Sequence, residues 1–263
     1  YLGGSEHATG HLLYSRFWHK FLFDLGLLPV EEYAKKLINQ GMILGSSAFI
    51  YRKSGTKTYV SKDLLNSWEG YEPIRVDVNL VNTTDELDVE GLRKWQAQFE
   101  SAEFIMKMNV FKVGREVEKM SKSKYNVVNP DEICDQYGAD TLRMYEMFLG
   151  PIEQAKPWNT SGISGVHNFL KKYLRLFYND EKWIVTNEEP SKGELKILHE
   201  TIKKINNDIE NFSFNTCVSS FMICVNELTS FNCHTRVILS PLTILLSPFA
   251  PHLAEELWEK LGN

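Results

Sequence analysis

The stretch Glu118-Lys119-Met120-Ser121-Lys122-Ser123-Lys124-Tyr125-Asn126 lies near the middle of the 263-residue sequence and decides how the rest is interpreted. Its closely spaced lysines and serines fit neither a buried strand nor an amphipathic helix, so we expect an exposed loop. Three ammonium groups, two hydroxyls and the backbone N–H groups of a turn form a set of donors suited to polyphosphate. Composition alone favours a simpler interpretation, a solvated basic turn.

The string from Lys119 to Ser123 resembles, residue for residue, the KMSKS signature of class I aminoacyl-tRNA synthetases. The resemblance implies ATP, with Mg²⁺ as its counter-ion, as a substrate. During amino-acid activation, negative charge accumulates on the α-phosphate and the departing pyrophosphate, and donors aimed at this charge act mainly in the transition state. We therefore expect Lys119 and Lys122 to be catalytic and to contact the pyrophosphate, with Met120, Ser121 and Ser123 as further ATP-binding residues.

The first eleven residues, Tyr1-Leu-Gly-Gly-Ser-Glu-His-Ala-Thr-Gly-His11, are expected to pass from a short extended piece through a glycine turn into a helix. Ser5 is the expected N-cap, and the free N–H groups of the first turns favour anionic ligands. Apolar residues then recur at every fourth position until Gly26, with Pro29 just beyond, which predicts one apolar helix stripe. This stripe comprises Leu13, Phe17, Phe21 and Leu25.

The same opening segment, extended to Lys20, resembles the part of leucyl-tRNA synthetases that re-enters the catalytic domain after the editing domain. The resemblance implies that Gly3, Gly4 and Glu6 approach the adenosine ribose of ATP. It also implies that His7 and His11 bind substrate on the leucine and phosphate side of the pocket. Glycines permit close backbone approach, and a carboxylate can accept hydrogen bonds from both ribose hydroxyls.

His7 and His11 also have the i, i+4 spacing of two zinc ligands on a helix, which raises a metal-dependent hydrolase with Glu6 as an alternative. The metalloprotease pattern needs a glutamate directly after the first histidine, and this sequence has Ala8 there. We therefore expect no metal site in the chain. Two histidines packed at the start of a helix are the remaining alternative.

The residues between the opening helix and the lysine loop change character several times. Pro29 to Gln40 is expected to form a second short helix. Ser47 to Val60 predicts a β-hairpin that turns at Ser54-Gly55, and Ile74 to Val81 alternates as a strand does. Leu87 to Ala102 is expected to be helical, and strands over 104–117 are expected to lead into the loop.

Beyond the loop the pattern is helical. Asn129-Pro130 predicts a helix start, and Ser191 with Glu194 predicts a capping box. Long amphipathic helices with short links imply a bundle. The run 248–258, Pro-Phe-Ala-Pro-His-Leu-Ala-Glu-Glu-Leu-Trp, resembles the helical anticodon-binding domain of the same family. A bundle that only stacks on its neighbour, without touching RNA, is the alternative.

Composition limits the class of protein. The formal net charge of −5 argues against nucleic-acid binding through a bulk positive field, so any RNA contact must be local. Four cysteines at irregular spacing suggest neither a zinc knuckle nor a disulfide framework, and we expect them to be reduced and mostly buried. With no membrane-length apolar run and no visible signal peptide, the expected location is cytoplasmic. A start at Tyr1 rather than methionine indicates an excised piece of a longer protein.

We therefore expect an α/β fold: a partial Rossmann-type class I synthetase half with a small β-containing insertion, followed by an all-α helical bundle. Residues 1–44 are assigned to the second-half catalytic segment and 45–110 to the inserted α+β subdomain. Residues 111–160 are assigned to the KMSKS loop and stem-contact region, and 161–263 to the anticodon-binding-type bundle.

The run from Tyr137 to Asn159 resembles the leucine-specific members of the family. The resemblance implies a parent enzyme, expected to be monomeric, that activates L-leucine with ATP and transfers it to tRNA(Leu). The HIGH motif is absent, because His7-Ala-Thr-Gly-His11 has one residue too many, and so is the editing domain. This chain alone is therefore expected to be inactive. The competing hypothesis is a non-catalytic tRNA-binding module derived from a synthetase.

Tyr125 departs from the family pattern, and its ring could either restrict the loop or stack on a neighbour.

Overall fold

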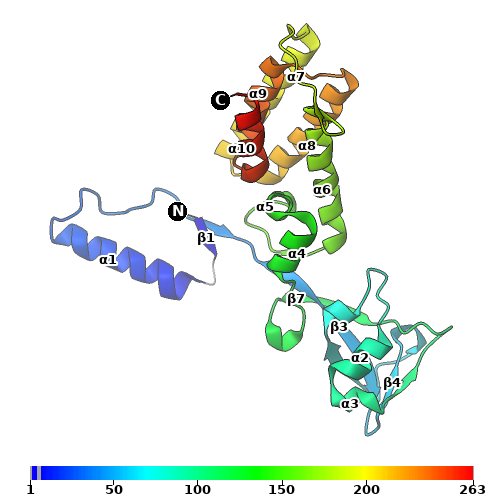
Figure 1. Ribbon diagram of the computed structural model, residues 1–263. Coiled ribbons are helices and arrows are strands. Elements are labelled where there is room, and N and C mark those ends of the chain that lie inside the picture. The colour runs from blue at the N-terminus through cyan, green and yellow to red at the C-terminus, as the bar shows by residue number, and fades with distance from the viewer. Residues whose placement is uncertain (1, 5–6, 263) are drawn as a thin grey trace. The chain divides into compact units, whose positions relative to one another are not determined.

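The computed structural model describes residues 2–4 and 7–262, which form two compact units. We call them the β unit, made of Met42–Asn129 and Ala155–Ser161, and the helical unit, made of Tyr1–Gly41, Pro130–Gln154 and Gly162–Asn263. Figure 1 shows the elements of each. None of the helices among the described residues is long and apolar enough to span a membrane.

The β unit is organised around one long strand, β3, which pairs with four others. The order β5-β3-β4-β6 runs through the sheet, and β7 and β8 also pair with β3. The predicted hairpin is confirmed: Tyr51 lies opposite Val60, and Gly55 takes the positive φ of 73° that a tight turn favours. The strands are β3 (Ile43–Lys53), β4 (Thr58–Val60), β5 (Tyr71–Val76), β6 (Glu103–Ile105), β7 (Gly114–Lys119) and β8 (Lys156–Pro157).

Two short helices, α2 (Val89–Trp95) and α3 (Ala97–Glu100), replace the single helix expected over Leu87–Ala102. The chain is extended at Gln96, which separates them. The strand expected over Ile74–Val81 is also only partly right. It ends at Val76, because the Asp77 carboxylate accepts the N–H of Asn79 and starts a 3-10 turn.

The apolar residues of these elements form one core in the β unit, which fixes the sheet against α2 and α3. The fully buried ring of Phe99 lies edge-on to Tyr59 and stacked on Trp95. The core comprises Ala48, Ile50, Tyr59, Val76, Leu87, Leu92, Phe99, Ala102, Phe111 and Val113.

The opening segment forms a strand, helix and parallel strand. Strand β1 (Leu2–Gly4) pairs in parallel with β2 (Ile38–Gln40), and the connection contains a π-helical turn over Ala8–Leu12 followed by helix α1 (Leu13–Asp24). Parallel strands require such a crossover, and this is the repeating unit of nucleotide-binding α/β sheets. The expected N-cap, Ser5, lies outside the described residues.

The helix predicted over Pro29–Gln40 is wrong. Residues 28–37 follow an irregular path along α1, and Ile38 is buried in β2. The path is held by side chains of α1: Arg16 pairs with Glu32, and the Ser15 hydroxyl is 2.9 Å from that of Tyr33. Contacts between residues distant in sequence therefore outweigh the weak helical spacing.

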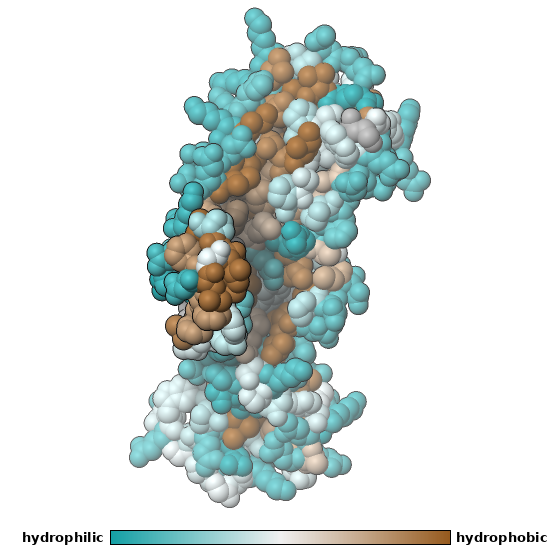
Figure 2. All heavy atoms as spheres, turned by 90° about the vertical axis from the view of Figure 1, so that its left-hand side faces the viewer, coloured by the Kyte–Doolittle hydropathy of each residue, from teal (hydrophilic) through white to brown (hydrophobic). Residues whose placement is uncertain are grey.

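The predicted stripe of α1 forms, but the described chain leaves it uncovered. The helix has no buried residue, and Gly26 takes a positive φ just beyond its end. Figure 2 shows apolar side chains gathered on the face that carries α1. Apolar residues of this size on one face are typical of a contact surface. The exposed residues are Leu13, Tyr14, Phe17, Trp18, Phe21 and Leu25.

In the part of the chain that the structure describes, seven further helices form the rest of the helical unit, as the sequence predicts. They surround a core that includes the fully buried Tyr173, whose hydroxyl is 3.1 Å from that of Thr243. Asp140 of α5 accepts the N–H of Leu253 at 2.7 Å and so caps α10. The helices are α4 (Pro130–Tyr137), α5 (Ala139–Phe148), α6 (Thr160–Leu174), α7 (Lys192–Glu210), α8 (Phe214–Ser230), α9 (Arg236–Leu246) and α10 (Pro251–Lys260). A short hairpin of β9 (Tyr178–Asn179) and β10 (Lys182–Trp183) follows α6.

The four cysteines are free thiols, and Cys217, Cys224 and Cys233 are buried, as expected. Burial raises the pKa of each of these three thiols to about 11. They are therefore protonated at neutral pH and act as small apolar core residues.

The capping box predicted at α7 is confirmed in both directions. The Ser191 hydroxyl accepts the N–H of Glu194 at 3.2 Å, and the Glu194 carboxylate accepts the N–H of Ser191 at 2.6 Å. Burial acts to raise the pKa of Glu194, but hydrogen bonds from Cys233 and Ser191 outweigh it, and the net pKa is lowered.

We expect Ser191→Ala to lower the free energy of unfolding by about 0.5–2 kcal/mol, because one N–H of the first turn loses its acceptor. A carboxyl with a lowered pKa stabilises the fold above its unfolded pKa and stops doing so as the pH falls. The deficit should therefore be full at pH 7 and smaller below about pH 4. Denaturant unfolding at both pH values measures it, with Ser230→Ala at the exposed end of α8 as the control. Equal stability of the two variants at pH 7 would contradict the assignment.

Candidate active site

The lysine loop begins where β7 ends. Leu44 of β3 lies opposite Lys119, the last residue of β7. Ser121 is extended, Lys122–Lys124 form a 3-10 turn, and Tyr125 closes it in the left-handed conformation with φ 54°. The stretch is therefore a turn held by a strand on its entry side, in agreement with the exposed loop predicted from sequence.

The three lysines of the loop have different surroundings. The ammonium of Lys124 is ion-paired with Glu118. Lys119 and Lys122 are exposed, and within the described part of the chain their ammonium groups have no hydrogen-bonding or ion-pair partner. The hydroxyls of Ser121 and Ser123 lie 2.9 Å apart across the turn. One lysine thus anchors the loop while two remain available for an anion.

The carboxylate of Glu118 holds Lys124 in place and is itself bound by two other side chains. Besides Lys124, its carboxylate accepts hydrogen bonds from the Ser47 hydroxyl at 2.5 Å and from Arg75 at 3.2 Å. These hydrogen bonds, that of Lys124 first, lower the pKa of Glu118 to about 2. The carboxylate is therefore ionised throughout the neutral and mildly acidic range.

We expect the loop to keep its conformation between pH 7 and pH 4. A depressed carboxyl pKa contributes stability that is present above the unfolded pKa and is lost only as the pH falls towards about 2. Glu118→Gln should release Lys124 already at pH 7, because the amide carries no charge. Amide NMR shifts of residues 121–126 measure this. A Glu118 carboxyl that titrates near pH 4.5 in the wild type would show that the anchor is absent.

Asn126 ties the two ends of the loop together. Its side chain is 1% exposed, and its Oδ1 accepts the N–H of Ser121 at 2.8 Å while its Nδ2 donates to the carbonyl of Lys119 at 3.3 Å. Gly45 of β3 lies directly beneath it. A Cβ atom at Gly45 would lie 2.6 Å from the Asn126 carbonyl oxygen, so a larger residue would displace the loop.

The ring of Tyr125 packs against a neighbouring ring, in an edge-on contact rather than the stacked one that the sequence left open. It lies edge-on to Trp95 of α2, with ring centroids 4.8 Å apart. Its carbonyl accepts the N–H of Val78 at 3.0 Å. Trp95 in turn stacks on the buried Phe99, so the loop is connected to the core of the β unit.

The residues predicted at the start of the chain lie in the helical unit. Gly3 and Gly4 belong to β1, where they lie opposite Asn39 and Gln40 of β2. His7 and His11 are both exposed, and His11 lies in the π-helical turn before α1. Glu6 lies outside the described residues. Over 2–4 and 7–262, no group of three His, Cys, Asp or Glu side chains is placed to hold a metal ion.

Comparisons with known proteins identify two segments of the chain, one that includes the lysine loop and one that covers the C-terminal helices. Residues 105–158, which include the loop, match the family model "tRNA synthetases class I (I, L, M and V)", and residues 193–263 match "Anticodon-binding domain of tRNA ligase". The whole chain is 66% identical to leucine–tRNA ligases of Christiangramia forsetii and Flavobacterium johnsoniae. Over its whole length the chain is similar to one part of leucine–tRNA ligases.

This chain spans 27% and 28% of the length of those two ligases. It also resembles, with a TM-score of 0.62 and 27% identity, a crystal structure of an Agrobacterium radiobacter K84 LeuRS in a ternary complex with tRNA and LeuAMS. That likeness covers all of this chain and 27% of the other. The predicted class, a Rossmann-type synthetase half followed by a helical bundle, is confirmed.

Within this family context, the sequence interpretation missed the residues that support the loop. Glu118, Lys124 and Asn126 stood in the quoted stretch without assigned roles. Asn126 two residues after the last lysine was the only local signal, since asparagine often bonds to nearby backbone groups in turns. Nothing in the sequence pointed to Gly45 or Trp95, which come from other elements of the β unit.

Proposed function

We propose that this chain supplies part of a leucine–tRNA ligase that uses ATP to form leucyl-adenylate and then transfers leucine to tRNA(Leu). The ammonium groups of Lys119 and Lys122 stabilise the pyrophosphate as its negative charge develops. The observation that carries this proposal is that the three lysines of the loop have different surroundings. Lys124 is held by Glu118, whereas Lys119 and Lys122 stand exposed on a turn that Asn126 fixes.

The chemistry fits this arrangement. An ammonium group on a flexible stem can follow phosphate oxygens through the reaction, while the backbone of the turn stays in place. Ser121 and Ser123 close the turn, and Met120 lies between the two catalytic lysines in sequence. Mg²⁺ accompanies ATP as its counter-ion and neutralises phosphate charge. We propose that the ribose of ATP is approached by Gly3, Gly4 and Glu6. The leucine and phosphate side of the pocket is bound by His7 and His11.

The 263-residue chain by itself is proposed to be inactive. It lacks a HIGH motif, and the stripe of α1 exposes apolar residues that further sequence would cover. Aminoacylation belongs to the complete protein, which we propose is a cytoplasmic monomer.

Leucine-dependent exchange of pyrophosphate into ATP tests the proposal. We expect no exchange by this chain alone and exchange by the complete protein. Exchange by the isolated chain would show that the missing parts are dispensable. A complete protein that binds tRNA but never exchanges pyrophosphate would favour the alternative, a non-catalytic tRNA-binding module.

A further inference from the structure

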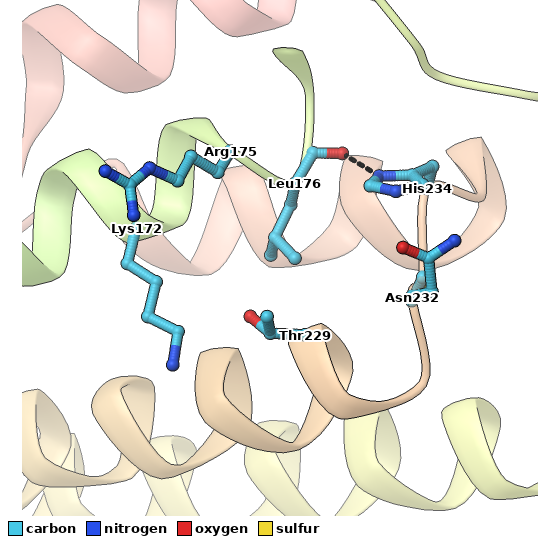
Figure 3. Close-up of a pocket in the computed structure, with 7 residues that line it drawn as sticks. Lys172, Arg175, Leu176, Thr229, Asn232 and His234 are labelled. Carbon is cyan, nitrogen blue, oxygen red and sulfur yellow. Dashed lines mark hydrogen bonds between the residues drawn. The ribbon is translucent and has the colours of Figure 1, made fainter. Parts of the chain in front are cut away.

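A small basic pocket lies in the helical unit, away from the residues discussed so far. It is formed where the end of α6 faces the end of α8 and the loop after it (Figure 3). Its volume is about 150 Å³. This is below the roughly 300–1,000 Å³ of pockets that enclose small-molecule ligands. The lining residues of this basic pocket are Lys172, Arg175, Leu176, Thr229, Asn232, Cys233 and His234.

The charged side chains that line the basic pocket are all positive. Lys172 lies in the last turn of α6, Arg175 follows directly after that helix, and the described lining residues include no carboxylate. The Lys172 ammonium donates to the Asn226 side chain at 2.6 Å, which leaves it further hydrogens to donate. Arg175 is exposed, and among the described residues its guanidinium has no hydrogen-bond or ion-pair partner.

The polar groups opposite the two cations are held in place. Nδ1 of His234 lies 2.8 Å from the carbonyl oxygen of Leu176, which can only accept, so Nδ1 is the donor. Asn232 is fixed in the left-handed conformation with φ 52°, and its N–H donates to the carbonyl of Thr229. Buried Cys233 lies between Asn232 and His234. Hydrogen bonds to the backbone therefore fix this side of the pocket.

Two acids, Asp180 and Glu181, need to be considered because they border a second hollow that also includes Arg175. Neither forms an ion pair with Arg175. Among the described residues, therefore, no carboxylate pairs with this guanidinium. Each residue offers an anionic oxygen a different contact: Arg175 a planar fork of N–H donors, and Lys172, whose ammonium also binds Asn226 of α8, a point charge.

We propose that the basic pocket binds a backbone phosphate of the tRNA. The size suits one anionic group of a longer molecule better than a whole metabolite. The net charge of −5 requires any RNA contact to be local, and this pocket is such a local concentration of positive charge. Two of its three segments, the end of α8 and the following loop, belong to the part of the chain that matches the anticodon-binding domain. The proposal rests on the proposed function, because it takes tRNA as the partner.

The test measures the affinity of the 263-residue chain for a tRNA(Leu) transcript at several salt concentrations. Arg175→Ala and Lys172→Ala should each weaken binding by roughly tenfold and reduce the slope of log K against log salt by about one, as expected for a lost phosphate contact. A second tRNA should be affected equally, because a backbone contact does not read sequence. The matched control is Lys203→Ala, which removes one exposed charge from α7 of the same unit.

The outcomes separate this proposal from the proposed function. If Arg175→Ala and Lys172→Ala bind tRNA as Lys203→Ala does, or if the wild-type chain does not bind tRNA, the pocket assignment is overturned while pyrophosphate exchange is untouched. If the two variants lose affinity but the complete protein never exchanges pyrophosphate, the pocket assignment stands and the ligase function fails. Arg175→Lys should recover part of the lost affinity, and unchanged thermal unfolding shows that the variants fold.

Discussion

Lys122→Ala is expected to lower leucine-dependent ATP–pyrophosphate exchange in the complete protein by about a hundred- to a thousand-fold. The reason is that its ammonium is exposed on the turn, and no described residue holds it in the ground state. The Lys122 ammonium therefore interacts with the pyrophosphate mainly when negative charge develops on it in the transition state. The loss should appear in kcat rather than in KM for ATP. Lys119→Ala should behave in the same direction.

The control for this prediction is Lys57→Ala, at the turn between β3 and β4 of the same unit. It removes the same charge and leaves the loop intact, so exchange should stay close to that of the wild type. Lys122→Arg keeps the charge but replaces a compact ammonium with a planar group, and should recover only part of the rate. Full exchange by Lys122→Ala would remove the assigned role of the loop.

Asn126→Ala is expected to have the second largest effect, because one side chain holds both ends of the loop. The variant removes the hydrogen bonds to the N–H of Ser121 and the carbonyl of Lys119, which are part-buried and contribute about 0.5–1.5 kcal/mol each. We expect exchange to fall by roughly ten- to a hundred-fold, since misplaced catalytic groups lose rate steeply. Overall secondary structure, measured by circular dichroism, should be retained.

Gly45→Ala perturbs the same contact from the opposite side. The added Cβ would meet the Asn126 carbonyl oxygen at 2.6 Å and its Cγ at 2.9 Å, so the loop must move. Exchange should fall as it does in Asn126→Ala. The matched control is Gly165→Ala within α6, where an added Cβ meets nothing within 4 Å and alanine favours the helix. If Gly45→Ala and Gly165→Ala are equally active, Asn126 does not position the loop.

Features set by local spacing could be predicted from the sequence. The capping box at Ser191 and Glu194, the hairpin turn at Gly55 and the end of α1 just before Gly26 all depend on residues within a few positions of each other. Their physical causes, a satisfied backbone group or a left-handed turn, act within one short segment. The lysine loop belongs to this class, because its composition excludes both a buried strand and an amphipathic helix.

Features that depend on a distant partner could not be predicted in this way. Residues 29–40 carried a weak helical spacing, yet Ile38 to Gln40 form a strand because Leu2 to Gly4 lie beside them. The same holds for Tyr125, whose ring direction depends on Trp95 thirty residues earlier. A backbone segment with partners elsewhere in the chain follows those partners rather than its own propensity.

By itself the sequence determined that a cationic turn stands at the centre of this chain, because lysine and serine at that spacing leave no other local structure. It also determined the positions of the bundle helices through their caps and apolar stripes. Only the tertiary structure decided that Lys124 is the anchor while Lys119 and Lys122 stay exposed. The reason is that three contacts set this difference. Glu118 pairs with Lys124, Asn126 bonds to the backbone of the loop, and Gly45 of β3 leaves room for Asn126.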